Sequence, residues 1–319
     1  ALKRENSNHE KLRTLFKIWG DNKSFSEIDW IEGDILDPSS ARKLVEGADY
    51  FFHCAAIVSF EPKDKDKMMK VNVSGTKNVI LAALDSNIKK FCHASSVAAL
   101  GRSRSDDPQH LTNENCEWRE STENSHYSIS KYLAEKELWA VRDKGLKFVI
   151  VNPSIIIGAN IDDRSSGMLF SAAYKGNPFY TNGVNGFVDL RDVSQAMITL
   201  SESDIEAERF IVSEGNYSYK HILTLIAENL KRRKPFIKLT SSTLSLLQII
   251  EKFRAKLLKS KPFITKETAT TATSKHLYSN QKIKKSIHPE FIPIESSIKY
   301  NSEVFLELKK SSSQNNIQI

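Results

Sequence analysis

The chain has 319 residues, of which 40% are hydrophobic and 27% are charged, as in an ordinary globular protein with one large or two unequal domains. Its three cysteines show no metal-like spacing and are too few for a disulfide framework, which favours a reducing cytoplasm and no metal site. No uncharged apolar run reaches the length of a membrane span, and no signal peptide opens the chain. These features argue against secreted, metal-dependent and membrane-spanning classes.

The net charge of +7 is unevenly distributed. Residues 217–319 carry 19 Lys and Arg against 7 Glu and no Asp, so this third has a charge of +12 and the remainder −5. Such asymmetry fits an anionic substrate, a membrane surface or a nucleic acid. A solvated basic face explains it equally well, and no nucleic-acid motif accompanies it. We therefore predict no nucleic-acid partner.

The first two hundred residues alternate short apolar runs with amphipathic stretches, the pattern of βαβ units and a parallel sheet. Ligands bind at the carboxyl ends of the strands in such a doubly wound sheet. The predicted fold class is α/β with a doubly wound parallel sheet. The expected strands are 28–32, 50–55, 90–94 and 148–152, and the expected helices are 39–46, 67–85 and one that carries Tyr127 and Lys131.

The texture changes after Pro153. Residues 158–186 are expected to form loops and a short helix over a cleft, residues 187–193 to open a helix, and residues 210–213 to form a strand. The remaining expected helices cover 220–232, 243–258 and 265–272. The first domain then comprises 1–153 with 187–214, a smaller, mostly helical cap comprises 154–186 with 215–308, and 309–319 form a flexible tail. The apolar face of 244–258 could touch a membrane or pack in the cap core.

The most informative motif joins Tyr127 and Lys131, about thirty residues after Ser95 and Ser96 at the end of a predicted strand. Residues four apart share one face of a helix. An ammonium there can lower the pKa of the phenol and let the tyrosine act as a general acid. A serine hydroxyl nearby could hold a substrate carbonyl. The motif predicts a carbonyl–alcohol redox enzyme.

Two other tyrosine–lysine pairs have the same spacing. Tyr278 and Lys282 lie in a stretch that predicts a loop. Tyr132 shares the predicted helix with Tyr127 but lies roughly 140° further round it. Only Tyr127 follows a strand that ends in hydroxyls, and it has small neighbours that leave room for a flat cofactor.

A dinucleotide-binding fold should open with a strand, a glycine-rich turn and a helix that holds the pyrophosphate. None of the twelve glycines forms that turn, and residues 1–4 read as the end of a second strand. We expect that an N-terminal segment of roughly thirty residues, one βα unit, is missing. Its absence would leave unpaired backbone and an apolar slot, and the chain as printed should be unstable or inactive. The alternative is a protein that binds no dinucleotide.

Several motifs in order resemble the extended short-chain dehydrogenase/reductases, over residues 1 to about 308. They are Gly33-Asp34-Ile35, His53-Cys-Ala-Ala56, the Asn-x-x-Gly-Thr helix that starts at Asn72, Ser95-Ser96 with Gly101, Tyr127 with Lys131, Asn152-Pro153-Ser154 ending in Gly158, and Phe187–Val193. The form that begins at Asn152 is more similar to the dihydroflavonol-reductase and 3β-hydroxysteroid-dehydrogenase branch than to the nucleotide-sugar epimerases.

The resemblance implies a Rossmann-type fold and a role for each matching residue. Ser96, Tyr127 and Lys131 would be catalytic, with Ser96 preferred to Ser95 by alignment on Gly101. The cofactor-binding positions would be Arg4, Asp34, Ile35, Ala55, Ala56, Asn72, Ser95, Lys131, Pro153 and Ser154. Arg4 stands where relatives that use NADP(H) place a cation, so we expect NADP(H) rather than NAD(H). An exposed basic turn is the alternative reading.

The expected function is reduction of a ketone or aldehyde, or the reverse oxidation, with a small-molecule substrate and a possible homodimer. Two alternatives remain open: a nucleotide-sugar epimerase or dehydratase with bound NAD, and a non-catalytic NADP-binding regulator. The apolar residues Met168, Phe170, Tyr174, Phe179 and Tyr180 could line a substrate pocket or form cap core.

Overall fold

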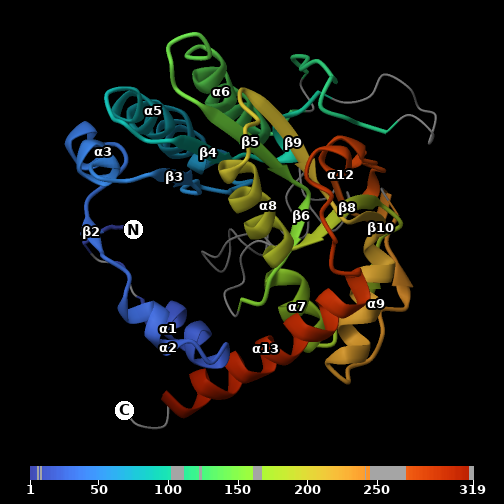
Figure 1. The fold of residues 1–319 in the computed structure, drawn as a ribbon. Coiled ribbons are helices and arrows are strands. Elements are labelled where there is room, and N and C mark those ends of the chain that lie inside the picture. Colours follow the sequence, from blue (N-terminus) through green and yellow to red (C-terminus); the bar gives the residue numbers. More distant parts are fainter. Residues whose placement is uncertain are drawn as a thin grey trace.

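The computed structural model describes residues 1–5, 7, 9–101, 111–121, 124–160, 167–240, 242–244 and 271–315. Its main sheet contains four parallel strands in the order β3-β4-β5-β9 (Figure 1). They are β3 (Tyr50–His53), β4 (Lys90–Ala94), β5 (Phe148–Pro153) and β9 (Glu208–Val212). Every residue of β5 is buried, because the neighbouring strands and the helices on both faces cover it.

Helices cover both faces of this sheet. On one face, α3 (Pro38–Val45), α5 (Thr76–Leu84) and α6 (His126–Trp139) pack their apolar side chains against residues such as Phe91 and Phe148. On the other, α8 (Leu190–Glu202) and α12 (Gln281–Ile287) pack against Cys92 and Val149. This arrangement confirms the doubly wound α/β class and places the carboxyl ends of β3, β4 and β5 at one edge of the sheet.

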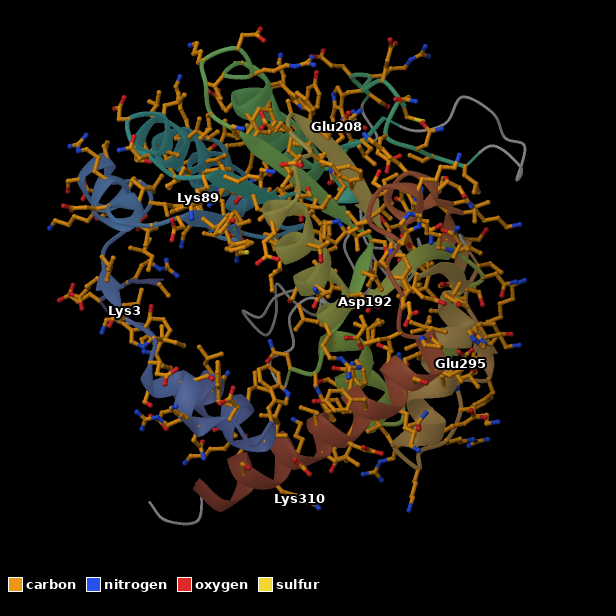
Figure 2. The ribbon with its side chains drawn as sticks, viewed as in Figure 1. Lys3, Lys89, Asp192, Glu208, Glu295 and Lys310 are labelled. Atoms are coloured by element: carbon orange, nitrogen blue, oxygen red, sulfur yellow. The ribbon has the colours of Figure 1, made fainter. Side chains whose placement is uncertain are left out.

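The N-terminal strands form a separate two-stranded parallel sheet. In it β1 (Leu2–Lys3) pairs with β2 (Ile31–Glu32), and among the described residues neither strand bonds to β3. Figure 1 shows this pair apart from β3, and Figure 2 marks Lys3 on it. Among the described residues, β3 is therefore an outer strand of the main sheet.

The face of β3 turned away from the helices α3 and α5 is poorly covered. Tyr50 and Phe52 are 37% and 42% exposed there, while Phe51 and His53, on the opposite face, are buried. An unpaired edge beside exposed aromatic side chains is unusual within a parallel sheet, whose strands are normally covered on both faces.

The predicted helix 67–85 is helical almost throughout, but its middle part is a π-helical turn. It comprises the short 3₁₀ turn η1 (Pro62–Asp64), α4 (Lys65–Met69), the π-helical turn η2 (Lys70–Gly75) and α5. Such π turns are rare in proteins, and those that occur often lie at functional sites. Here the turn contains Asn72, and Gly75 allows the close approach of Ile35, whose side chain would meet an added Cβ at 2.6 Å.

The cap combines helices with two small sheets. Strands β10 (Gly215–Ser218), β8 (Val184–Asp189) and β6 (Ile155–Ile157) form one sheet, and β11 (Ile237–Lys238) pairs with β7 (Phe179–Tyr180). The cap core joins them to α7 (Gly167–Tyr174), α9 (Tyr219–Asn229) and α13 (Ile294–Asn315). The predicted division into two domains is not tested by these observations and stays a prediction.

Several boundaries differ from the predictions. Residues 187–189 end strand β8 instead of opening a helix, and α8 begins at Leu190, where the Asp189 carboxylate accepts from the Arg191 amide. Helix α13 continues to Asn315, into the segment predicted to be flexible. Helices α1 (Glu10–Ile18) and α2 (Asn22–Ser26) were not predicted. The predicted helix 265–272 and residues 245–258 of its neighbour lie outside the described residues, apart from 271–272.

Within the described part of the chain, no helix combines the length and apolarity needed to cross a bilayer. The same residues include no group of three or more His, Cys, Asp or Glu side chains arranged to hold a metal ion.

Candidate active site

Helix α6 carries the tyrosine and lysine of the central motif on one face. The helix begins after Ser125, whose hydroxyl accepts a hydrogen bond from the Ser128 amide at 3.0 Å. Tyr127 is half-buried, and Lys131, one turn further, is 2% exposed. The Lys131 ammonium donates to the carbonyl of Ala94 at 2.7 Å, which fixes the helix against the end of β4.

The two serines that follow β4 have different partners. The Ser96 hydroxyl lies close enough to the Tyr127 phenol to lower its pKa, and it accepts from the Ala98 amide at 3.1 Å. The Ser95 hydroxyl is buried and donates to Glu135 at 2.5 Å. The structure therefore brings Ser96 to Tyr127 and turns Ser95 toward another part of the helix.

The pKa of Tyr127 is raised from its ordinary value because burial disfavours the phenolate, and the nearby Ser96 hydroxyl only partly opposes this effect. The sequence-based expectation that Lys131 lowers this pKa is therefore wrong for the chain as it stands. The physical reason is that the ammonium is directed to the Ala94 carbonyl. A neutral phenol is nevertheless the form that can donate a proton.

Burial lowers the pKa of Lys131 to about 8, against the opposing effects of Glu135 and Cys54. Near neutral pH most of this side chain is still an ammonium. Its charge is thus held in a dry setting, where an electrostatic interaction with a bound anion or hydroxyl is stronger than in water.

Asn72 joins the π-helical turn to its surroundings. Its amide donates both N–H groups within the protein, to the Ile57 carbonyl at 2.9 Å and to the Ser130 hydroxyl at 2.9 Å. Its oxygen accepts from the Ile57 amide at 2.7 Å, and Ser130 donates to the Tyr127 carbonyl at 2.8 Å. These bonds tie the segment after β3 to the helix that carries Tyr127.

The remaining predicted positions near the sheet edge fall into an exposed and a buried group. Ala55 and Ala56 are exposed after β3. Pro153 ends β5, and Ser154, which is 6% exposed, donates its amide to the Val212 carbonyl at 3.0 Å. The small alanines leave open surface beside Lys131, whereas Ser154 is part of the sheet framework.

Asp34, Ile35 and Arg4 lie with the separate N-terminal sheet. The Asp34 carboxylate accepts from the Leu36 amide at 2.9 Å, Ile35 is buried against Gly75, and Arg4 is exposed. The Asn78 side chain donates to the carbonyls of Ile35 and Leu36, at 3.0 and 3.1 Å, and so links this loop to α5.

Glu135 was missed by the sequence analysis. It lies four residues beyond Lys131, on the same face of α6, and is 1% exposed. Its carboxylate accepts from Ser95 and from the Asn152 amide, each at 2.5 Å, and forms an ion pair with Arg209 at 3.4 Å. The signal that could have revealed it is the continuation of the four-residue spacing from Tyr127 through Lys131.

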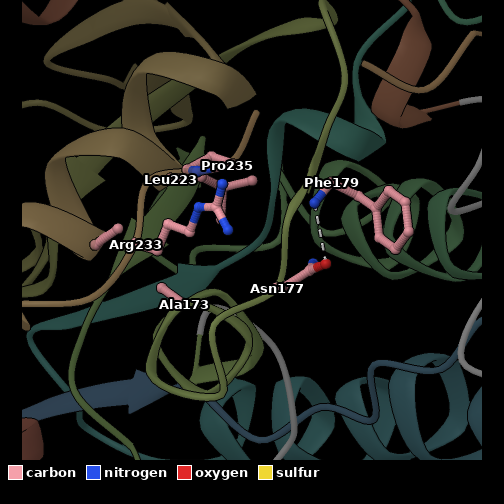
Figure 3. Close-up of a pocket in the computed structure, with 7 residues that line it drawn as sticks. Ala173, Asn177, Phe179, Leu223, Arg233 and Pro235 are labelled. Atoms are coloured by element: carbon pink, nitrogen blue, oxygen red, sulfur yellow. Dashed lines mark hydrogen bonds between the residues drawn. The ribbon is translucent and has the colours of Figure 1, made fainter. Parts of the chain in front are cut away.

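A shallow hollow in the cap, without a measurable enclosed cavity, is separate from this site (Figure 3). It is lined by Ala173, Asn177, Phe179, Leu223, Ala227, Arg233 and Pro235. Of the aromatic residues considered for a substrate pocket, Phe170 and Tyr174 instead pack against Phe305 in the cap core. The hollow contains none of the predicted catalytic or cofactor residues.

Comparison with known proteins decides the family. The model described as "NAD dependent epimerase/dehydratase family" matches residues 1–212. The chain belongs to this family. It is therefore an extended short-chain dehydrogenase/reductase by sequence, and the presence of both reductases and epimerases among its relatives and structural neighbours fits NAD(P)-dependent redox chemistry.

Individual relatives of this family member are reductases. Cinnamoyl-CoA reductase 1 of Petunia hybrida is 30% identical over 192 residues, covering 58% of this chain and 56% of the relative. A putative dihydroflavonol 4-reductase of Synechocystis is 31% identical over 213 residues, covering 64% and 60%. The match thus spans little more than half the length of these two relatives. The crystal structure of gox2253 has a TM-score of 0.75 at 27% identity and covers 95% of this chain and 88% of its own.

Proposed function

We propose that this chain carries the catalytic site of an NADP(H)-dependent reductase that interconverts a ketone or aldehyde and an alcohol. The observation that carries the proposal is that three side chains gather at the end of β4. The Ser96 hydroxyl acts on the Tyr127 phenol, and Lys131 lies one turn further along α6 and donates to the Ala94 carbonyl. The sequence relatives named above support a reductase more than an epimerase.

The residues at the ends of β3, β4 and β5 fit the nicotinamide and ribose half of the cofactor. Exposed alanines follow β3, and the buried ammonium of Lys131 lies near them, as its interaction with Cys54 indicates. Lys131 would bind ribose hydroxyls, and Ala55, Ala56 and Pro153 would border the ring. When bound, the reduced cofactor supplies a hydride to the carbonyl carbon. No glycine-rich turn for a pyrophosphate is present among the described residues.

The protein side chains would supply the proton and the orientation. The Ser96 hydroxyl would donate to the substrate carbonyl oxygen and hold it beside the phenol. Tyr127 would transfer its proton to that oxygen as negative charge develops, which is general acid catalysis. The Lys131 ammonium would hold the ribose hydroxyls, and so keep the cofactor beside these two side chains.

We propose NADP(H) over NAD(H) because Arg4 is an exposed guanidinium at the end of β1, and a guanidinium suits a phosphate. Asp34 and Ile35, in the loop after β2, would border the adenine. This half of the site depends on how the β1–β2 pair is placed relative to β3.

We further propose that the unpaired edge of β3 takes a strand of an additional βα unit, whose helix would cover Tyr50 and Phe52. Without that unit the chain of 319 residues should bind the cofactor weakly and show little turnover. The partner is otherwise a small carbonyl compound. A homodimer through the helices that carry Asn72 and Tyr127, and a cytoplasmic location suited to three free cysteines, complete the proposal.

The test compares the 319-residue chain with a longer version that carries such a βα unit, titrating each with NADPH and NADH. Tight NADPH binding by the longer version alone supports both the reductase and the role of β3. A preference for NADH favours the epimerase alternative. A folded longer version that binds neither cofactor contradicts the proposed enzyme.

A further inference from the structure

The face of α6 that carries the proposed catalytic groups extends one turn beyond them. Tyr127, Lys131 and Glu135 are spaced four residues apart, so their side chains lie in one row. Lys131 bonds to the carbonyl of Ala94, and Glu135 bonds to the hydroxyl of the next residue, Ser95. The ammonium and the carboxylate thus hold consecutive residues at the end of β4.

Glu135 also reaches Ser96 through an intermediary. The Asn152 amide donates one N–H to the Glu135 carboxylate at 2.5 Å and the other to the Ser96 carbonyl at 2.9 Å. The position of the Ser96 backbone therefore depends on a side chain that Glu135 orients. A buried carboxylate that accepts several hydrogen bonds holds its partners strongly, because leaving any of them unpaired is unfavourable.

The electrostatic surroundings of Lys131 come from three elements. Cys54 after β3, His53 on β3 and His93 on β4 interact with it, besides Glu135 on its own helix. Burial lowers the pKa of His53 to about 3 and lowers that of His93, and it raises the pKa of the Cys54 thiol. These three groups are therefore neutral near pH 7, and among the four only Glu135 brings a carboxylate.

We propose that Glu135 is a positioning residue of this site, which holds Ser95 and Asn152, and through Asn152 the backbone of Ser96, in place at the end of β4, and whose charge acts on the Lys131 ammonium. The inference rests on the proposed reductase function for its catalytic meaning. Arg209 forms an ion pair with Glu135 and donates to the Glu114 carbonyl at 2.9 Å. It thereby links Glu135 to the segment that contains Glu114.

The experiment compares E135Q and E135D with the unsubstituted protein and uses E137Q as the matched control, all in the longer version that carries the additional βα unit. Glu137 lies on the same helix but pairs with Lys77 at the surface. Lysines labelled with ¹³C at Cε are titrated by NMR, with K131R to assign the Lys131 signal, and kcat and KM are measured across pH. In E135Q the pKa of Lys131 should fall by about one unit, and the basic limb of the activity profile should shift with it, giving about fivefold less activity at pH 8.

E135D keeps the charge but shortens the reach, so it should retain the Lys131 titration and lose kcat with little change in KM. E137Q should match the wild type in both measurements. An unchanged Lys131 titration in E135Q, or a wild-type kcat in E135D, overturns the proposal, and the second test holds even if E135Q does not fold. If E135Q shifts the Lys131 titration but the unsubstituted protein turns over no carbonyl substrate, the proposed reductase fails, while the link between Glu135 and Lys131 is supported.

Discussion

The end of β4 and the β1–β2 pair differ in how many hydrogen bonds connect them to the rest of the main domain. At β4, Ser95, Ser96 and Lys131 have partners on neighbouring strands or on α6. The β1–β2 pair is a separate sheet, and side-chain bonds from Asn78 on α5 link the loop that follows it to the main domain. The half of the site proposed for proton transfer is therefore pre-organised, whereas the half proposed for the adenine end lies on the separate β1–β2 pair.

The comparison explains why the catalytic and binding roles should separate under mutation. Changes at α6 should affect turnover without loosening the N-terminal sheet. Changes at Arg4 or Asn78 should affect cofactor binding without altering the tyrosine. The following predictions, made for a version of the chain with a completed sheet, test this separation.

Replacing Tyr127 by Phe should reduce kcat by about 10²–10⁴-fold, the range expected when a general acid is lost. Cofactor affinity should change little, because no contact of the Tyr127 hydroxyl other than that with Ser96 is removed. Steady-state kinetics and NADPH titration of the same preparation measure the two effects. Tyr132→Phe, on the same helix but stacked on Trp118, is the control. Retained turnover in the Tyr127 variant would sink the role assigned to this residue.

Replacing Arg4 by Ala should weaken NADPH binding by about tenfold and leave NADH binding nearly unchanged, since a charged hydrogen bond to phosphate contributes about 1.5–3 kcal/mol and this side chain is exposed. Fluorescence titration with both cofactors checks the ratio. Lys3→Ala is a useful comparison because Lys3 pairs with Glu32 at 3.9 Å. Equal losses for both cofactors would contradict a phosphate-specific role.

Replacing Asn78 by Ala should weaken cofactor binding by about fivefold, a loss of about 1 kcal/mol, by releasing the carbonyls of Ile35 and Leu36 from α5. The kcat at saturating cofactor should stay near the wild-type value. Asn229→Ala removes a comparable bond within a cap helix and serves as the control. A fall in kcat instead of affinity would show that the two regions are not separable.

Activity should fall by about half as the pH rises to 8, because the pKa of Lys131 is about 8 and its charged form is proposed to act. The stability effect has the opposite sign. The folded pKa lies below the value of 10.5 for an unperturbed lysine, so the unfolded chain binds the extra proton between about pH 8 and 10.5, and the contribution of this group to stability rises there. Urea unfolding beside kinetics at each pH separates the two trends. Parallel loss of both would contradict the assignment.

The sequence predicts the central strands well because they are short, mostly apolar runs between polar segments. The predicted strand 90–94 coincides with β4, and 148–152 differs from β5 by one residue. By contrast, residues 187–189 were predicted to open a helix but form the end of β8. Its role emerges only from pairing with β6 and β10.

Longer-range features could not be predicted in the same way. Helix α13 has buried Ser297 and Asn301, which bond to Asp189 across more than one hundred residues. Periodicity does not reveal such partners, because polar residues predict an exposed face. In the site, the spacing of Tyr127 and Lys131 was visible in the sequence, but the direction of the ammonium and the network of Glu135 depend on the packing of α6 against β4 and β5.

The most direct test of the central claim follows the hydride itself. The protein is incubated with NADPH carrying deuterium at C4 of the nicotinamide and with a panel of ketones and aldehydes, and the products are examined by mass spectrometry. A reductase transfers the label to the carbinol carbon of a released alcohol, and the Tyr127→Phe variant should show almost no transfer. The absence of labelled alcohol from every carbonyl, in a protein shown to bind NADPH, would contradict the account.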